Sequence, residues 1–205
     1  LIRRVNGRPA WALGWPLLTA PDGTKLGKTT GARIWLDPDK TSPYQFFQHW
    51  MQTDDRQVHQ FLAQFTLLPM AEIEAVVTAH LAEPGRREGQ RRLAREATAL
   101  VHGPAQAAAA EEASAILFGA PVADASIEAL DAVAREVPVL DATADDLAAG
   151  LDLVDLLARP GSLAASKGEA RRAVDQGGVY VNGARADGNR QVNAEDTLHG
   201  RYVVL

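Results

Sequence analysis

The chain has 205 residues, of which 46% are hydrophobic and 23% are charged, and this ordinary globular usage excludes a wholly disordered protein. It has no cysteine, which excludes disulfide frameworks and thiolate metal sites and suits a reducing compartment. No apolar run is long enough for a membrane-spanning helix, and the first residues lack a signal-peptide pattern. The start at Leu1, without a methionine, is interpreted as a cut point in a longer protein.

Charge is distributed unevenly along the chain, whose formal net charge is −5. Residues 1–103 carry 13 basic and 10 acidic side chains, residues 104–150 carry 1 and 9, and residues 151–205 carry 7 of each. A polyanion would be repelled by the middle segment and could engage only the two flanks. The alternative interpretation is that the acidic surface only keeps the protein soluble.

Helices are predicted for most of the first two thirds of the chain. Residues 1–42 are rich in glycine and proline, which excludes a long helix there. Helix starts at Ser42-Pro43, because serine can cap and proline suits the first helical position. Apolar residues then recur at helical spacing as far as residue 65, with a break and a new cap at 53–55. Further helices are predicted over 70–82, 86–102, 105–118 and 126–137.

The pattern weakens over residues 138–150, which we interpret as a domain boundary. A short helix is predicted over 151–158 and another over 166–176, which ends at two glycines. Asn182-Gly183 between two apolar runs predicts a tight hairpin of residues 179–181 and 184–186. Residues 201–205 are predicted to form a last strand, so the fold class is mainly α with a small α+β C-terminal module.

One loop carries the residue types that phosphate chemistry needs. Lys25 and Lys28 are three residues apart, Gly27 between them permits a bend, and Thr29 offers a neutral donor. Two such lysines can both turn toward one polyphosphate. The spacing is not that of a P-loop, and a solvated lysine turn is the alternative.

The sequence Lys25-Leu26-Gly27-Lys28-Thr29 resembles the KMSKS loop of class I aminoacyl-tRNA synthetases, in the variant of the tyrosyl-tRNA synthetases. The segments 16–19, 22–24, 34–38, 40–44 and 53–56 are similar to the flanks of that loop in the bacterial enzymes. The departures are Leu26, where phenylalanine is usual, and Gly14-Trp15.

The resemblance implies a tyrosine–tRNA ligase that activates tyrosine with ATP, accompanied by Mg²⁺, and transfers it to tRNA(Tyr). It implies that Lys25, Lys28 and Thr29 are catalytic residues and that Lys25, Gly27 and Lys28 bind the ATP phosphates. It also implies a cytoplasmic homodimer with no membrane association and no protein-bound metal.

The family's HIGH-type motif is not found in the chain. Residues 1–42 are therefore expected to be the end, or stub, of a doubly wound α/β catalytic domain. The chain alone is expected to be inactive.

The C-terminal segment resembles the RNA-binding domain named after small-subunit ribosomal protein S-four, on residues 164–174 and 177–183. Its helix would be capped by Ser166 and would start with cations, an arrangement that suits phosphate. The predicted RNA-binding residues are Ser166, Lys167, Arg171, Arg172 and Asn182. A capped surface helix without RNA contact is the alternative.

Residues 43–140 are expected to be an α-helical anticodon-binding region and residues 150–205 the S-four-type module, truncated at its end.

Two further sequence patterns bear on function, and two rival functions stay open. Arg87, Arg91 and Arg95 form a helical stripe that could follow RNA phosphates. The alternative is a solvated salt-bridge face, in which Glu88 and Glu96 lie within reach of Arg92. The five histidines lack metal-ligand spacing. The rival functions are a stand-alone RNA-binding or ribosome-associated adaptor and an acidic helical interaction protein.

Overall fold

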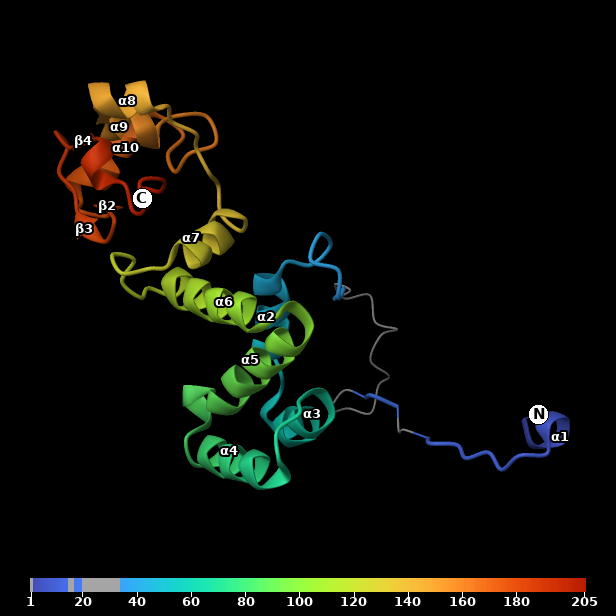
Figure 1. The fold of residues 1–205 in the computed structure, drawn as a ribbon. Helices are drawn as coiled ribbons and strands as arrows, with labels where there is room; N and C mark the ends of the chain where they lie inside the picture. Colours follow the sequence, from blue (N-terminus) through green and yellow to red (C-terminus); the bar gives the residue numbers. More distant parts are fainter. Residues whose placement is uncertain (1, 15–16, 20–33) are drawn as a thin grey trace.

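The computed structural model describes residues 2–14, 17–19 and 34–205 and is built mainly from helices, with small sheets near the C-terminus (Figure 1). The helices are α1 (Ile2–Asn6), α2 (Pro43–Met51), α3 (Val58–Phe65), α4 (Met70–Ala82), α5 (Glu88–His102), α6 (Pro104–Leu117), α7 (Ile127–Ala134), α8 (Ala144–Ala149), α9 (Leu153–Leu157) and α10 (Lys167–Asp175). The strands are β1 (Leu151–Asp152), β2 (Tyr180–Val181), β3 (Ala184–Arg185) and β4 (Gln191–Val192). The predicted fold class, mainly α with a small α+β module, is confirmed. Each described helix is too short or too polar to span a membrane.

Helices α2 to α7 form an elongated stack, with α4 at one end and α7 at the other (Figure 1). Helix α5 contacts α2, α3, α4 and α6, while α7 packs on α6. The core between α3, α4 and α5 is built from Leu62, Ile73 and Leu93, each at most 1% exposed. Trp50 lies edge-on to Phe61, at 6.1 Å between ring centroids, so these aromatic side chains serve packing.

Gly89 allows the closest approach within this stack. A Cβ atom at Gly89 would lie 2.6 Å from Cγ1 of Val58 and 3.0 Å from the ring of His80. His80 is buried, and its Nε2 lies 3.1 Å from Oδ1 of Asp55. The start of α5 therefore sits against α3 and α4 at a distance that only glycine permits.

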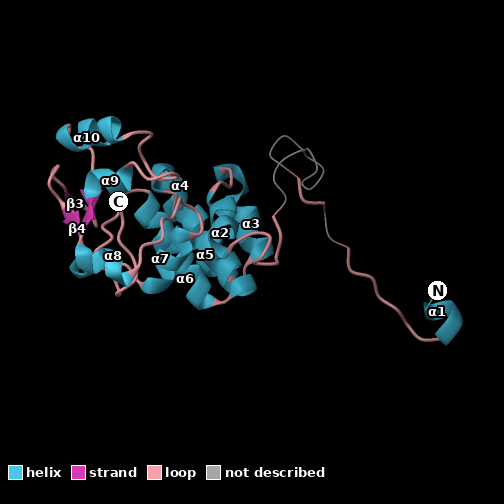
Figure 2. Cartoon of the chain, turned by 90° about the horizontal axis from the view of Figure 1, so that it is seen from above, coloured by secondary structure: helices cyan, strands magenta, loops and turns pink. Residues whose placement is uncertain are grey.

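The C-terminal module has its own core, formed by α9, α10 and the strands (Figure 2). Leu153, Leu157 and Ala170 are at most 2% exposed within it. Strands β1 and β4 pair antiparallel, as do β2 and β3. The predicted hairpin is confirmed: Asn182 (φ 49°) and Gly183 (φ 82°) are both left-handed, as a primed turn requires.

Helix α8 was not predicted, although residues 143–146 carry its start signal. The Thr143 hydroxyl accepts from the backbone of Asp146 (3.1 Å), and the Asp146 carboxylate accepts from the backbone of Thr143 (2.9 Å). Leu147 packs α8 against the C-terminal core. One apolar contact residue is not enough to give a periodic pattern, which explains why the sequence predicted a domain boundary and no helix here.

Two predictions in the module are wrong in detail. Residues 201–205 form no strand and make only an isolated bridge between Leu198 and Tyr202. Tyr202 and Val204 pack on α6 and α7, while Val203 packs on the core of the C-terminal module, so the alternation reflects burial of both faces and not strand pairing. The predicted helix 151–158 starts only at Leu153, because Asp152 is its cap and accepts from the backbone N–H of Asp155 at 3.0 Å.

The close approach at Gly89 gives a stability prediction. We expect Gly89→Ala to lower the free energy of unfolding by about 1–3 kcal/mol, because the methyl group overpacks a rigid core. Gly168 is the matched control, since its Cβ would meet nothing closer than 3.7 Å in α10. Gly168→Ala should stabilise the protein by about 0.4–1 kcal/mol. Urea unfolding of both variants checks this, and stabilisation by both would contradict the packing argument.

The ring of His102 gives a pH prediction. Burial lowers the pKa of His102 below 6.5, and its Nε2 is buried without a hydrogen-bond partner in the described part of the chain. Because the folded state favours the neutral ring, stability from this group is present above about pH 6.5 and is lost as the pH falls through the lowered pKa. Unfolding at pH 7.5 and pH 5 should show a smaller acid loss in His102→Gln than in the unchanged protein. Equal losses would mean that His102 is hydrated when folded.

Candidate nucleic-acid interface

The N-cap and the first two turns of α10 hold four of the five residues predicted to bind RNA. Ser166 caps the helix, its Oγ accepting from the backbone N–H of Glu169 at 3.2 Å. The carboxylate of Glu169 accepts in return from the backbone N–H of Ala165 at 2.9 Å. The cap fixes where the helix starts and therefore which side chains project from its positive end.

Lys167 is partnered within the module. Its Nζ lies 2.7 Å from Oδ1 of Asp155 on α9, and both side chains are more than half exposed. An exposed ion pair of this kind contributes little to stability, so a phosphate can replace the carboxylate at small cost. The ammonium of Lys167 is thus held close to the start of α10, and its carboxylate partner can be exchanged for a phosphate.

Arg171 and Arg172 are both exposed, and neither has an ion-pair or hydrogen-bond partner among the described residues. The Arg172 guanidinium lies over the first turn, since a Cβ at Gly168 would be 3.7 Å from its Nη1. Lys167 and Arg171 are four residues apart on one helical face. Three cations therefore surround the start of one helix, with one carboxylate pairing among them.

Asn182 differs from these four residues because its side chain already has internal partners. Its Nδ2 donates to the carbonyl of Asp196 at 2.5 Å, and its Oδ1 accepts from the backbone N–H of Val204 at 2.9 Å. Its backbone N–H also donates to the Val204 carbonyl at 2.8 Å. The amide connects the hairpin to the end of the chain, and a contact with RNA stays a prediction for it.

The hairpin carries two side chains that the sequence analysis did not single out. Tyr180, which is 48% exposed, lies directly opposite Arg185 across β2 and β3. The Arg185 guanidinium covers Gly177 at the end of α10, where a Cβ would lie 1.7 Å away. An exposed ring beside a guanidinium suits base stacking. The hairpin register predicted from Asn182-Gly183 would have placed the pair, but neither residue type alone gave a signal.

The arginines of α5 belong mainly to the salt-bridged alternative. Arg95 makes two hydrogen bonds to Glu111, of 2.8 and 2.9 Å, and these bonds raise the pKa of Arg95. Arg92 pairs with Glu96 at 2.9 Å. Arg87 lies before the helix, with φ 55°, and donates to the Met51 carbonyl. Glu88 pairs with Arg86, at 3.3 Å, and not with Arg92.

The predicted phosphate loop, with Lys25, Gly27, Lys28 and Thr29, lies outside the described residues. Both of its described flanks are held by a hydrogen bond that involves a buried side chain. On one side the Gln57 amide donates to the carbonyl of Thr19 at 2.7 Å. On the other, the backbone N–H of Trp35 donates to the hydroxyl of Thr41 at 3.0 Å. Gln57 and Thr41 are buried, so both attachment points are shielded from water.

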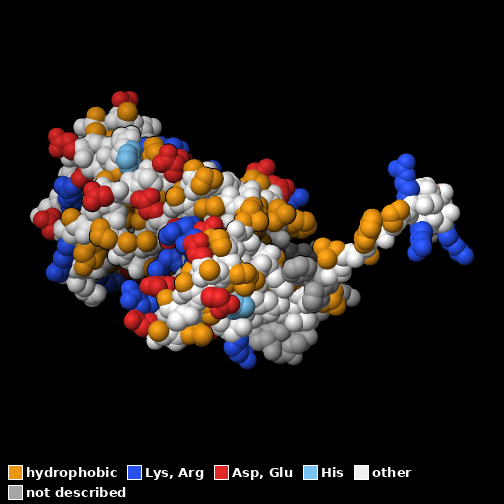
Figure 3. Space-filling view, turned by 60° about the horizontal axis from the view of Figure 1, so that its bottom comes forward, with side chains coloured by type: hydrophobic (Ala, Val, Ile, Leu, Met, Phe, Trp, Pro, Cys, Tyr) orange, Lys and Arg blue, Asp and Glu red, His pale blue; other side chains and the backbone are white. Residues whose placement is uncertain are grey.

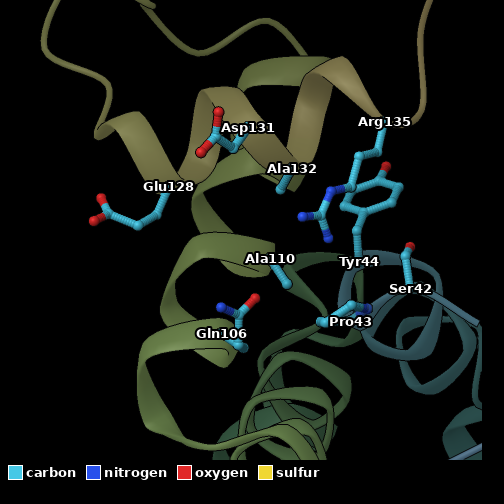
Figure 4. A pocket seen from close by; sticks show the side chains of 9 residues that line it. All are labelled: Ser42, Pro43, Tyr44, Gln106, Ala110, Glu128, Asp131, Ala132 and Arg135. Carbon is cyan, nitrogen blue, oxygen red and sulfur yellow. The ribbon is translucent and has the colours of Figure 1, made fainter. Parts of the chain in front are cut away.

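Two hollows occur on the described helices. One, of about 80 Å³, lies between the start of α2 and helices α6 and α7, with Tyr44 and Arg135 projecting beside it (Figure 4). It is smaller than the several hundred Å³ typical of ligand sites. The other, open and about 560 Å³, is lined by residues 52–55, 84–85, Arg87 and Gln90. No group of three or more possible metal-binding side chains occurs in the described ranges.

The surface mixes charges of both signs on the face shown in Figure 3, where basic and acidic side chains lie next to each other. At the start of the described chain, residues 2–14 carry three exposed arginines, Arg3, Arg4 and Arg8, and no acidic residue. Affinity for a polyanion must therefore come from local groups of unpaired cations. In the C-terminal module Arg171 and Arg172 on α10 are such cations among the described residues, while Lys167 is paired with Asp155.

Two family models match this chain. Residues 1–119 match the class I tRNA synthetases (W and Y), and residues 129–205 match the tyrosine–tRNA ligase SYY-like C-terminal domain. The chain belongs to the class I tRNA synthetases of the tryptophan and tyrosine group. The second match associates its C-terminal part with the tyrosine branch.

Curated relatives match over the whole chain. They include the tyrosine–tRNA ligase of Roseiflexus castenholzii, 44% identical over 207 residues, and that of Anaeromyxobacter dehalogenans, 47% identical over 207 residues. A third, from Thermobifida fusca, is 44% identical over 213 residues. The alignments cover all of this chain and 49%, 49% and 48% of these proteins. The chain thus spans about half the length of the relatives it matches.

The exposure of Arg171 and Arg172 gives a prediction for RNA binding. Replacing both with alanine should weaken tRNA binding and flatten its salt dependence by about 1–2 units, because each phosphate contact contributes about 0.7–0.9. The double lysine variant is the matched control, since it keeps both charges and should keep the slope. A titration of tRNA binding against salt decides this. An unchanged slope in the folded alanine variant would mean that both arginines only solvate the helix.

Proposed function

We propose that the protein to which this chain belongs is a tyrosine–tRNA ligase. The observation that supports this most strongly is the position of the two family matches. The first, over 1–119, includes the lysine loop, and the second, over 129–205, includes α10. A stand-alone adaptor would have no use for the lysine loop, and the relatives that match the whole chain are ligases.

The proposed reaction has two steps. The tyrosine carboxylate attacks the α-phosphate of ATP, the bond from that phosphorus to the bridging oxygen breaks, and pyrophosphate leaves. A hydroxyl of the terminal ribose of tRNA(Tyr) then attacks the tyrosyl carbonyl, an ester forms, the bond from that carbonyl to the phosphate oxygen breaks, and AMP leaves. Mg²⁺ accompanies ATP as part of the substrate.

Lys25 and Lys28 would contribute preorganised positive charge to the first step, in which negative charge develops on the α-phosphate and the leaving group. Gly27 lets the backbone bend toward the phosphates, and Thr29 adds a hydrogen bond. The bonds from Gln57 to Thr19 and from Trp35 to Thr41 support this role, because they attach both flanks of the loop to buried points. A loop with fixed ends needs less ordering when it closes on its substrate.

We further propose a division of labour along the chain. Residues 1–42 are the end of the catalytic domain, residues 43–140 the anticodon-binding region and residues 150–205 the S-four-type RNA-binding module. The separate core of the C-terminal module supports the last boundary, although Leu147 of α8 extends that core to an earlier residue. The proposed enzyme is a cytoplasmic homodimer.

Lys28→Ala tests the proposed function in the full-length enzyme. We expect tyrosyl-adenylate formation to slow by about 2–4 kcal/mol of barrier, as for loss of one preorganised charge contact, with little change in tyrosine affinity. Pyrophosphate exchange at saturating tyrosine and ATP measures the rate.

Lys40→Ala is the matched control. Its ammonium pairs with Asp37 at 3.3 Å and lies over the ring of Trp35 at 4.9 Å, so its contacts are local and lie outside the lysine loop. Its removal should leave the exchange rate unchanged. An unchanged rate in Lys28→Ala would remove that lysine from the mechanism, and no exchange in the unsubstituted enzyme would refute the ligase.

A further inference from the structure

The last residues of the chain, 198–204, connect the C-terminal module to the helical stack, and we name this segment the strap. Its apolar side chains Leu198, Tyr202 and Val204 are partly buried against the core between α6 and α7. The Nε2 of His199 lies 2.7 Å from the carbonyl of Ala125, just before α7. In Figure 1 the C-terminus lies on the side of the module that faces α7.

Asp131 on α7 is the polar centre of this contact. The Tyr202 hydroxyl donates to its Oδ1, and Nη1 of Arg201 lies 3.0 Å from the same oxygen. The Arg201 guanidinium also lies 5.0 Å from the centre of the Tyr202 ring. One carboxylate thus receives a hydroxyl and a guanidinium from neighbouring residues, and both bonds cross between the two parts of the protein.

The other side of the strap is fixed to the module. Asn182 holds Val204 by the two hydrogen bonds described above, of 2.8 and 2.9 Å. The hairpin of Asn182 follows α10 after a tight turn, where the backbone N–H of Gly178 donates to the carbonyl of Ala173 at 2.9 Å. A chain of short contacts therefore runs from Asp131 through the strap to α10.

The covalent linker between the two parts is less constrained. Residues 137–139 are exposed, and residues 138–142 contain no helix or strand. A linker of this kind limits the distance between two bodies but not their orientation. The strap supplies a second, non-covalent connection, and two connections restrict rotation where one does not.

We propose that the strap fixes the orientation of the C-terminal module, with Asp131 and Tyr202 as positioning residues, so that the cations of α10 and the helical stack meet one RNA together. This inference rests on the proposed function for its ligand, a structured RNA. The docking itself rests only on the contacts between the strap and α7.

Charge makes the effect of Asp131 on RNA binding distinctive. Removing an acidic side chain raises the net charge by one, which by electrostatics alone strengthens the binding of a polyanion. If Asp131 positions the module, Asp131→Ala weakens binding instead. Glu128 on the same helix is exposed and has no ion pair among the described residues. Glu128→Ala is therefore a control with the same change in charge.

The first experiment measures docking without RNA. The chain has no cysteine, so spin labels can be attached at Ala108→Cys on α6 and Gln176→Cys after α10, both exposed. Electron–electron distance measurements should give one narrow distribution in the unchanged protein and in Glu128→Ala. Asp131→Ala and the charge-neutral Tyr202→Phe should broaden it. A broad distribution in the unchanged protein, or a narrow one in all folded variants, would overturn the proposal.

The second experiment measures tRNA affinity of the same variants at fixed salt. If the docked fraction falls to between a third and a tenth, the apparent Kd rises about three- to tenfold. We expect this rise in Asp131→Ala and Tyr202→Phe, and an unchanged or tighter Kd in Glu128→Ala. Broadened distances with unchanged Kd would overturn the positioning role. No tRNA binding by any variant would refute the proposed function and leave the distance result on docking standing.

Discussion

The close packing around the start of α5 is the constraint on which the helical stack depends. Gly89 lets the backbone approach Val58 and His80 more closely than any side chain would allow, and α5 contacts four other helices. A helix packed against four others transmits small shifts, because protein interiors are packed as densely as crystals. Gln57, which holds one flank of the lysine loop, lies between α2 and α3, and Thr41, which holds the other, lies just before α2, so both positions depend on this packing.

Local signals predicted much of the fold. The caps at Ser42 and Ser166 and the turn at Asn182-Gly183 were read from neighbouring residues, and each depends on bonds within a few positions. Residues 201–205 were wrongly predicted to form a strand, because Tyr202 and Val204 face helices that are about 70 positions away in the sequence, while Val203 faces the C-terminal core. Alternation along a short segment shows that one face is buried, but not what covers it.

At the candidate site, too, the sequence did not show which partners the basic side chains have. Spacing grouped Lys167, Arg171 and Arg172 on one helix, yet only the structure distinguishes the lysine paired with Asp155 from the two guanidiniums that have no partner in the described part of the chain. On α5 the partner of Arg95 is Glu111, on the next helix. Basic side chains on a helix therefore differ in their availability for phosphate, since their acidic partners come from other elements.

The two hydrogen bonds that hold the flanks of the lysine loop have a thermodynamic consequence. Thr19 is bonded to Gln57 in the stack and Trp35 to Thr41 just before α2, so a shift of either point moves the ends of the loop. If the proposed enzyme binds RNA through this stack, an RNA that favours one arrangement of it would change the affinity for ATP. By reciprocity, ATP would then change the affinity for RNA by the same factor. In the proposed enzyme the two substrates would be coupled through Gln57 and Thr41.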